Sequence, residues 1–321
     1  VGNGVGYNAA PIRSSASPSI LIPASAATSS AAFADGVYAT GKTVSVAMLQ
    51  DHHSMAGRSL HRSASLAKYT KHPSFVEDPE HVHGEPLTLY KPFEYMSRGN
   101  QWGMVIDLST CFGCNACLVA CQSENSIPPV GKQQCLNGRE LHWVRVDRYF
   151  DENILSGDIR RQPRVLVQPV PCMQCEHAPC ETVCPAGATM HSNDGLNMMV
   201  YNRCIGTRYC ANNCPYKVRR FNFLKFVDDK TESLKLVRNP DVTVRHRGVM
   251  EKCTYCVQRI NEARIDIKKN PANRIDDPNA PGHDKWHIAD GRILTACQQA
   301  CPSCAISFGD ILDKGSRVAK L

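Results

Sequence analysis

Fifteen of the 17 cysteines in this chain fall into four groups, and their spacing constrains the fold more than any other feature. Gaps inside the groups are two or three residues, apart from a wider gap in the second group and a long excursion in the fourth. In the third group Thr207 stands where the spacing calls for a cysteine. The groups are Cys111, Cys114, Cys117 and Cys121; Cys172, Cys175, Cys180 and Cys184; Cys204, Cys210 and Cys214; and Cys253, Cys256, Cys297 and Cys301.

The spacing predicts iron-sulfur clusters. Gaps of two, two and three residues match the run in which bacterial ferredoxins hold four-iron clusters through cysteine thiolates, and proline follows the last cysteine of three groups. A neutral hydroxyl is a poor iron ligand beside a thiolate, so we expect Thr207 to face an empty corner. The chain is therefore predicted to hold three [4Fe-4S] clusters and one [3Fe-4S] cluster. In a two-cluster ferredoxin the fourth cysteine reaches the neighbouring cluster, so the groups must pair.

Other uses of cysteine fit less well. Structural zinc also uses closely spaced pairs, but three cysteines within seven residues would crowd a tetrahedral site. An odd number of clustered cysteines disfavours a disulfide framework, and no pair is followed by the histidine that a covalent c-type haem requires. Cys135 and Cys304 are left over and are interpreted as free thiols, with a spare ligand as the less favoured alternative.

Composition is typical of a folded protein. Hydrophobic residues make up 42% of 321, enough for two domains, and no long apolar run predicts a membrane span. The chain begins with Val1 and shows no signal-peptide pattern, so we interpret it as a piece of a longer polypeptide. The formal charge of +7 omits the thiolates; with clusters assembled the net charge falls to about −1. Nucleic-acid binding is disfavoured, since no aromatic-interleaved basic stripe occurs.

Four cations lie next to the cysteine groups in the sequence. Lys217, Arg219 and Arg220 follow the third group, and Lys252 precedes Cys253. They are placed to neutralise the clusters locally and to raise the reduction potentials. The alternative, that they are ordinary solvated charges, stays open.

Organisation along the chain is uneven. Residues 1–97 contain no cysteine, whereas the groups organise residues 102–308, so the boundary is expected near 97–101. Repeated strand, cluster loop and helix units predict an α+β fold with an internal duplication. Helices are expected after each fourth cysteine, and residues 270–290 are expected to form a surface loop. The pattern also predicts strands over 102–108, 164–170 and 196–201, and a helix over 252–269.

Three further motifs are weaker. Residues 36–43 match the P-loop pattern, but residues 43–49 look like a strand rather than the required helix, so nucleotide binding is disfavoured. The closely spaced glycines Gly2, Gly4 and Gly6 have no strand before them. His52 and His53 lack a further ligand at metal-site spacing and are interpreted as surface or interface residues.

Residues 204–221, CIGTRYCANNCPYKVRRF, resemble the third cysteine group of the four-cluster iron-sulfur subunits that accompany molybdopterin oxidoreductases and quinone-reactive membrane subunits. That family usually has cysteine at the position of Thr207; in nitrate-reductase-type members an aromatic residue there accompanies a three-iron cluster. The likeness covers about residues 100–310. Four flanking motifs look like the B subunit of alternative complex III, in which a molybdopterin-enzyme-like domain without cofactor precedes the iron-sulfur domain: GNGVGYN (2–8), QDHHSMAGR (50–58), VGK (130–132) and GRELHWVRVDRYF (138–150).

The resemblance implies the domains and the ligands. Residues 1–97 would be the tail of the molybdopterin-enzyme-like domain with a linker, and residues 98–321 two paired ferredoxin-like modules with loop insertions. Group one would pair with four, and group two with three. The implied [4Fe-4S] ligands are Cys111, Cys114, Cys117 and Cys301; Cys121, Cys253, Cys256 and Cys297; and Cys172, Cys175, Cys180 and Cys214; the [3Fe-4S] ligands are Cys184, Cys204 and Cys210.

Clusters conduct single electrons and supply no acid, base or nucleophile, so no catalytic residue is expected in this chain. By the resemblance, the three-iron cluster lies nearest the membrane and accepts electrons from quinol oxidised in a membrane subunit of the polysulfide-reductase type. Multihaem cytochrome c subunits would be the acceptors, on the periplasmic face of the bacterial cytoplasmic membrane. The alternative is the iron-sulfur subunit of a molybdenum-dependent polysulfide, tetrathionate, nitrate or sulfoxide reductase, with electrons leaving toward a pterin. No haem or molybdopterin is expected in this chain itself.

Overall fold

The computed structural model describes residues 42–50, 52–58, 60–76, 99–150, 165–270 and 287–321, and divides the chain into two units, Val1–Ala47 and Met48–Leu321. The strand predicted over 43–49 is wrong, because these residues are mostly exposed and pair with no strand in the described part of the chain. Residues 36–41 of the P-loop-like motif, the early glycines, residues 97 and 98, and most of the predicted loop over 270–290 lie outside the described residues.

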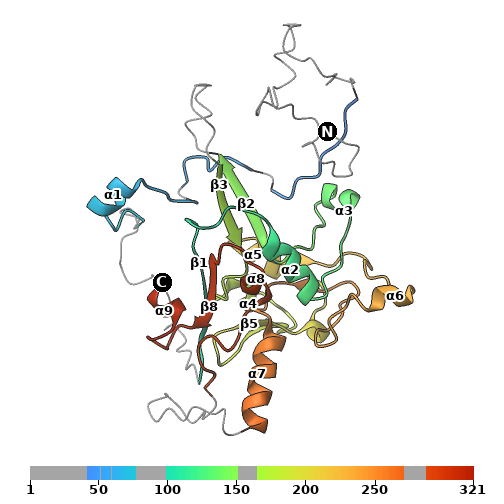
Figure 1. The fold of residues 1–321 in the computed structure, drawn as a ribbon. Helices are drawn as coiled ribbons and strands as arrows, with labels where there is room; N and C mark the ends of the chain where they lie inside the picture. The colour runs from blue at the N-terminus through green and yellow to red at the C-terminus, as the bar shows by residue number, and fades with distance from the viewer. Residues whose placement is uncertain (1–41, 51, 59, 77–98, 151–164, 271–286) are drawn as a thin grey trace, which may run out of the picture. The chain divides into compact units, whose positions relative to one another are not determined.

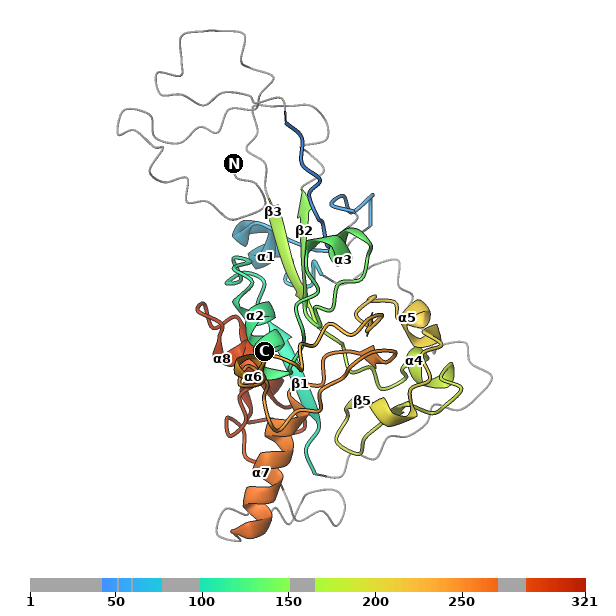
Figure 2. The ribbon, with the colours of Figure 1, turned by 90° about the vertical axis from the view of Figure 1, so that its right-hand side faces the viewer.

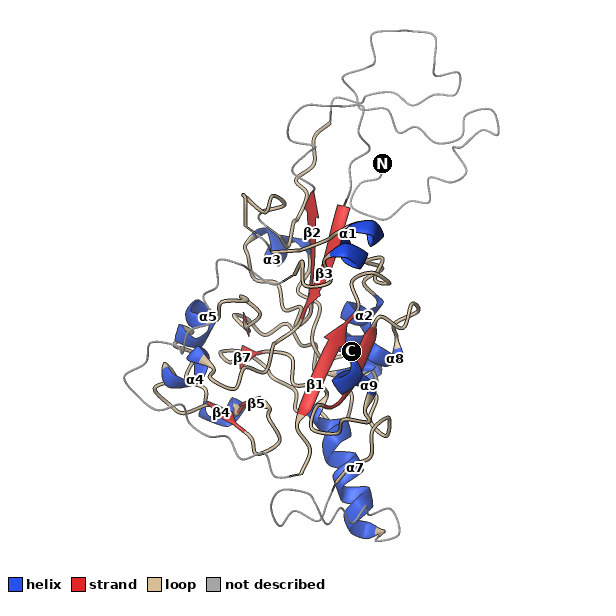
Figure 3. Ribbon diagram, turned by 90° about the vertical axis from the view of Figure 1, so that its left-hand side faces the viewer, coloured by secondary structure: helices blue, strands red, loops and turns tan. Residues whose placement is uncertain are grey.

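The strands form separate antiparallel pairs rather than one sheet (Figure 3). Pairing of the first strand with the last sets Trp102 opposite Asp310, so it joins the start of the cysteine-rich region to its end. The strands predicted over 102–108 and 164–170 are confirmed, and that over 196–201 is confirmed at its centre. The pairs are β1 (Trp102–Ile106) with β8 (Ile306–Asp310), β2 (Arg145–Phe150) with β3 (Val165–Val170), β4 (Thr189–His191) with β5 (Asn197–Met199), and β6 (Arg220–Phe221) with β7 (Met250–Glu251).

Four helices each carry the third cysteine of one group, counting Thr207 as a group member. The prediction of a helix after each fourth cysteine is wrong: in groups two to four the helix ends before that residue. The following proline keeps the fourth cysteine out of the helical region; Cys214 has φ −69° and ψ 116°. No proline follows Cys121, and its helix continues through it. The helices are α2 (Ala116–Glu124) with Cys117, α4 (Pro179–Thr182) with Cys180, α5 (Tyr209–Asn213) with Cys210, and α8 (Ala296–Gln299) with Cys297.

These short helices pack in two pairs. Helix α2 contacts α8, and α4 contacts α5, on two different sides of the strands (Figure 2). Group one therefore lies beside group four, and group two beside group three. Packing of the helices and the pairing of β1 with β8 bring together segments that are far apart in the sequence.

The remaining helices are peripheral to these contacts. The helix predicted over 252–269 is confirmed as α7 (Val257–Lys269), shown in orange in Figure 1, which buries Ile260, Ala263 and Ile267 on one face as an amphipathic helix does. No helix within the described ranges is long and apolar enough to cross a membrane. The others are α1 (Leu66–Lys71), α3 (Lys132–Leu136), α6 (Glu232–Lys235), α9 (Arg317–Lys320) and a 3-10 helix at Tyr201–Arg203.

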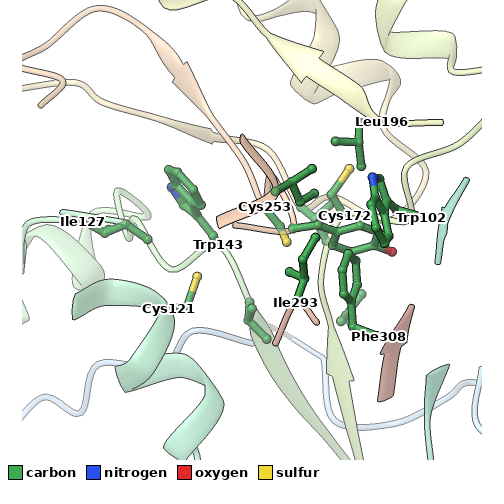
Figure 4. Close-up of a cluster of buried hydrophobic side chains, with 14 of the residues drawn as sticks. Trp102, Cys121, Ile127, Trp143, Cys172, Leu196, Cys253, Ile293 and Phe308 are labelled. Carbon is green, nitrogen blue, oxygen red and sulfur yellow. The ribbon is translucent and has the colours of Figure 1, made fainter. Parts of the chain in front are cut away.

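Cysteine side chains are part of the hydrophobic core. Trp102 stacks on Phe308 with ring centroids 5.3 Å apart, and Tyr255 meets Phe308 edge-on. Figure 4 shows the thiols of Cys121, Cys172 and Cys253 among these buried apolar groups. A second buried cluster contains Ala178, Cys180, Ala188, Met199, Cys210 and Met250. The protein thus packs its core around the thiols.

Two turns that follow a Cys-Pro pair have the same backbone. In both, an alanine N–H donates to the cysteine sulfur four residues earlier, Ala188 to Cys184 at 3.2 Å and Ala305 to Cys301 at 3.3 Å. The residue before each alanine is left-handed, Gly187 with φ 56° and Cys304 with φ 52°. The repeat fits an internally duplicated module, and Cys304 occupies a position that favours glycine.

We predict that Cys304→Gly stabilises the protein and Gly187→Ala destabilises it, each by about 1 kcal/mol, because a Cβ is strained in the left-handed region. Nothing lies within 4 Å of a Cβ at Gly187, so the effect there is one of backbone conformation. Anaerobic guanidinium unfolding of the cluster-containing protein measures both changes. Shifts of the two midpoints in the same direction would contradict the assignment.

Candidate metal centres

Loops of the four cysteine groups share a backbone feature. The residue before the second position of each group is left-handed, with φ of 71° at Gly113, 49° at Gln174, 79° at Gly206 and 54° at Tyr255. Left-handed residues in such loops turn successive N–H groups into anion-binding concavities, which occur at many iron-sulfur sites. The conformation is unfavourable for Gln174 and Tyr255, so it recurs against local preference.

Thr207 occupies the backbone position that Cys114 has in the first group. Gly113 and Asn115 flank Cys114 with φ of 71° and 65°; Gly206 and Arg208 flank Thr207 with φ of 79° and 62°. A Cβ at Gly206 would lie 3.0 Å from the carbonyl oxygen of Gly248, so the close approach there requires glycine. The third loop therefore has the same left-handed positions as the first, with an exposed threonine in place of a thiol.

The thiols of Cys111, Cys114, Cys117 and Cys301 line one cavity, between the first group and the turn after Cys301. Burial raises the pKa of Cys117 to about 11, and the thiols of Cys297, Cys111 and Cys114 add to the rise. Partial burial acts to raise the pKa of Cys301, but the hydroxyl of Ser303 and the N–H groups of Ala305 and Ile306 together lower it. These hydrogen bonds favour the anionic form of Cys301.

Cys121, Cys253, Cys256 and Cys297 form a second set and are all buried. Burial raises the pKa of Cys121 well above its usual range, and the other three thiols act in the same direction. Hydrogen bonds oppose this: Asn125 Nδ2 donates to Cys121 Sγ at 3.5 Å, and Ala296 N donates to Cys256 Sγ at 3.4 Å. Four adjoining thiolates without a bound cation would be unfavourable here, whereas a cluster core would compensate their charge.

The other thiols surround a buried arginine. Burial acts to lower the pKa of Arg219, but the thiols of Cys180, Cys210 and Cys172 raise it. Its guanidinium donates to Asn197 Oδ1 at 2.9 Å and to Thr189 Oγ1 at 3.1 Å. On one side of Arg219, the thiols of Cys172 and Cys214 act to raise the pKa of Cys175. On the other side, those of Cys204 and Cys184 act to raise the pKa of Cys210. The donor set thus fits two clusters with a shared cation.

The four cations singled out from the sequence have different surroundings. Lys252 is fully buried and donates from Nζ to the carbonyl oxygen of Cys253 at 2.9 Å, and Arg219 is buried as described. Arg220 pairs with Glu140 at 2.5 Å, and Lys217 is exposed. Local neutralisation of thiols therefore falls to Arg219 and Lys252.

A buried ion pair beside the second set was not predicted from the sequence. Arg245 Nη2 lies 3.1 Å from Glu251 Oε2, and the two side chains are 2% and 0% exposed. Trp143 Nε1 also donates to Glu251 Oε2 at 3.1 Å, and the guanidinium lies 5.0 Å from the centroid of the Trp143 ring. Arg245 and Glu251 are six residues apart, so the pair was within reach of a local reading, whereas the contribution of Trp143 comes from a separate segment.

The remaining predicted residues have varied surroundings. His53 Nδ1 is 3.2 Å from the carbonyl oxygen of Arg148, and its ring contacts Phe150, whereas His52 is exposed. Cys135 is half-buried in α3, and Cys304 is exposed. Among the described residues, no group of three or more His, Cys, Asp or Glu side chains could hold a single metal ion.

Sequence comparisons place the chain among known proteins. Two families described as 4Fe-4S dicluster domain match residues 163–232 and 203–305. The chain is 40% identical over 226 residues to the menaquinone reductase iron-sulfur cluster-binding subunit of Nitratidesulfovibrio vulgaris, covering 69% of this chain and 80% of the relative. It is 31% identical over 265 residues to the Hdr-like menaquinol oxidoreductase iron-sulfur subunit 1 of Archaeoglobus fulgidus, covering 77% and 79%. The B component of the polysulfide reductase of Wolinella succinogenes is 29% identical over 222 residues, covering 69% and 82%.

We predict that Glu251→Ala lowers the free energy of unfolding by about 3–5 kcal/mol, because it leaves the Arg245 guanidinium buried without its counter-charge. Guanidinium unfolding followed by tryptophan fluorescence measures the change. The control is Glu232→Ala, which breaks the exposed pair with Lys235 and should change the stability by less than about 1 kcal/mol. Equal effects of the two substitutions would show that burial of the pair is unimportant.

Proposed function

The chain belongs to the family of iron-sulfur subunits of menaquinol- and polysulfide-type reductases, and we propose that it conducts single electrons along four clusters within a quinone-reactive membrane complex. The placement of four thiol sets side by side, each on a loop with the same left-handed position, carries this proposal. Bound clusters would supply one-electron transfer. The side chains of this protein would hold the clusters, exclude water and set the surrounding charge.

The proposed ligands follow the contacts between helices. Contact of α2 with α8 supports ligation of two clusters by groups one and four, and contact of α4 with α5 supports ligation of two more by groups two and three. Thr207 leaves the last set with three thiols. We assign Cys111, Cys114, Cys117 and Cys301 to a first [4Fe-4S] cluster; Cys121, Cys253, Cys256 and Cys297 to a second; Cys172, Cys175, Cys180 and Cys214 to a third; and Cys184, Cys204 and Cys210 to the [3Fe-4S] cluster.

Contacts between neighbouring sets support a linear order. Cys117 and Cys121 on α2 connect the first and second sets. Gln174 Nε2, next to Cys175, donates to the carbonyl oxygen of Cys253 at 2.9 Å and connects the second to the third. Arg219 lies between the third set and the fourth. Electrons would therefore pass from one terminal set to the other through two central ones.

The terminal loops are the most exposed. The residue after the first cysteine is 64% exposed at Phe112 in group one and 69% at Ile205 in group three, against 39% at Met173 in group two. Apolar side chains that project beside a terminal cluster suit contact with a redox partner. We propose that the three-iron end accepts electrons from quinol oxidised in a membrane subunit, and that the Phe112 end passes them onward.

The complex we favour is alternative complex III, on the strength of the flanking motifs. Multihaem cytochrome c would then be the acceptor, with this chain on the periplasmic face of the membrane and residues 1–97 as the tail of a molybdopterin-enzyme-like domain. The second candidate is a molybdenum-dependent reductase, supported by the likeness to the polysulfide reductase component. The two differ in whether haem or pterin lies beyond the first cluster.

We predict about 15 iron atoms in the anaerobically purified protein, and in its oxidised form one spin of the EPR signal typical of a three-iron cluster. Thr207→Cys should add about one iron and remove that signal, because it restores the fourth thiolate. The reciprocal control, Cys114→Thr, should remove about one iron and double the signal. Sixteen irons in the unsubstituted protein, without the signal, would refute the three-iron assignment.

We expect the complex purified from its native membranes through a tag on this chain to contain c-type haem and no molybdopterin, because cytochrome subunits replace a pterin enzyme as electron acceptor. Haem is quantified by the pyridine haemochrome assay, and pterin by fluorescence of its oxidised form. Bound pterin without haem would select the molybdenum reductase instead.

A further inference from the structure

A cavity of about 250 Å³ is lined by residues from several segments, among them Asn125, Asn197 and Thr254. Side-chain amides are prominent in its lining, with Asn125, Asn197, Gln258 and Asn261 beside the aromatic rings of Trp143 and Tyr201. Two of these amides reach a cysteine sulfur, and the two sulfurs belong to different sets. The cavity therefore brings together polar groups that contact both central clusters of the proposed wire.

Asn125 contacts the second set. The residue is 2% exposed, and Nδ2 donates to Cys121 Sγ at 3.5 Å and to the carbonyl oxygen of Cys121 at 3.0 Å. Gln258 Nε2 donates to Asn125 Oδ1 at 3.3 Å, which requires the oxygen to face away from the sulfur. Arg245 Nη2 donates to the backbone oxygen of Asn125 at 2.9 Å. The amide is thus held with its N–H toward the thiol.

Asn197 contacts the third set in the same manner. It is 2% exposed, and Nδ2, which has two hydrogens, donates to the carboxylate of Glu181 and lies 3.7 Å from Cys180 Sγ. Arg219 Nη2 donates to Asn197 Oδ1 at 2.9 Å, and a guanidinium has no acceptor, so the amide orientation is fixed. Its backbone N–H donates to Gln174 Oε1 at 2.9 Å. A cysteine thiolate has no proton to give, so the amide must be the donor to a ligating Cys180.

We propose that Asn125 and Asn197 are potential-setting residues, each donating an N–H···S hydrogen bond to one thiolate of a different central cluster. The inference rests on the ligand sets proposed above. Reduction adds one electron and no proton, so the sulfur atoms become more negative and the hydrogen bonds become stronger. Such bonds therefore stabilise the reduced form and raise the reduction potential.

The test is an EPR-monitored redox titration of the purified protein, with iron and spins counted. Asn125→Leu removes one donor at similar volume and should lower the reduction equilibrium constant of the cluster on Cys121 about tenfold, which is about 59 mV for one electron. The cluster on Cys180 should keep its potential. Asn197→Leu should give the opposite pattern.

Asn197→Leu also removes a partner of Arg219 and of Glu181, so Thr189→Val provides a control of similar volume. It removes another partner of Arg219 and keeps the N–H of Asn197, and it should leave the potential of the cluster on Cys180 unchanged. A second control is Asn261→Leu, which lines the same cavity at an exposed position and should leave both potentials unchanged.

The outcomes separate this inference from the proposed function. An unsubstituted protein without four clusters would refute the function, whatever the variants do. Variants with full iron content and unchanged potentials would overturn the role of the asparagines while leaving the function intact. Equal shifts of both clusters in every variant would overturn it as well, because they would show a general change in the cavity rather than one hydrogen bond to each cluster.

Discussion

Negative charge on buried thiols is the constraint on which the rest of this structure depends. Cys121, Cys253, Cys256 and Cys297 are all buried, and a thiolate loses much of its hydration in such a place. The lost hydration is compensated by N–H groups of the left-handed turns, by amides such as Asn125, and by the cations of Arg219 and Lys252. A cluster core would contribute the largest positive charge. Folding of this region and loading of its metal are therefore expected to be one coupled process.

Alternating residues predicted the main strands, and cysteine spacing predicted the odd position of Thr207, because both depend on neighbours in the sequence. The helices expected after each fourth cysteine were misplaced: where a proline follows that cysteine, the helix ends before it, whereas α2 continues through Cys121. The ion pair between Arg245 and Glu251 and the two asparagines at the cavity were not predicted. Cys121 lies only four residues before Asn125, but that spacing does not show that the amide donates to the thiol. Asn197 and Cys180 are 17 residues apart, so their contact depends on how two segments pack in the folded chain.

The repeated backbone makes departures from the repeat informative. Gly113, Gln174, Gly206 and Tyr255 are left-handed at equivalent places, although glycine alone adopts that conformation without strain. Because the left-handed conformation occurs at all four positions, whether the residue is Gly, Gln or Tyr, it is imposed by the geometry of the cysteine loop rather than by the residue type. Thr207 and Cys304 differ in chemistry from Cys114 and Gly187 at the equivalent positions, but the backbone of each loop or turn is the same. The loop can therefore carry a threonine in place of a cysteine and keep its shape, which would allow one of the proposed clusters to differ from the others in iron content.

Exposure and charge are distributed unequally over the thiol sets. Phe112 and Ile205 are exposed in the first and third cysteine groups, whereas the thiols of the second set are buried. A cluster held by the second set would exchange electrons with its neighbours only, so the reduction potentials of those neighbours would decide the direction of electron flow. Arg219 influences thiols of both the third and the fourth set. The charge of Arg219 would favour reduction of either proposed cluster. Electrons on two neighbouring clusters would repel each other, so reduction of the fourth is expected to make the third harder to reduce.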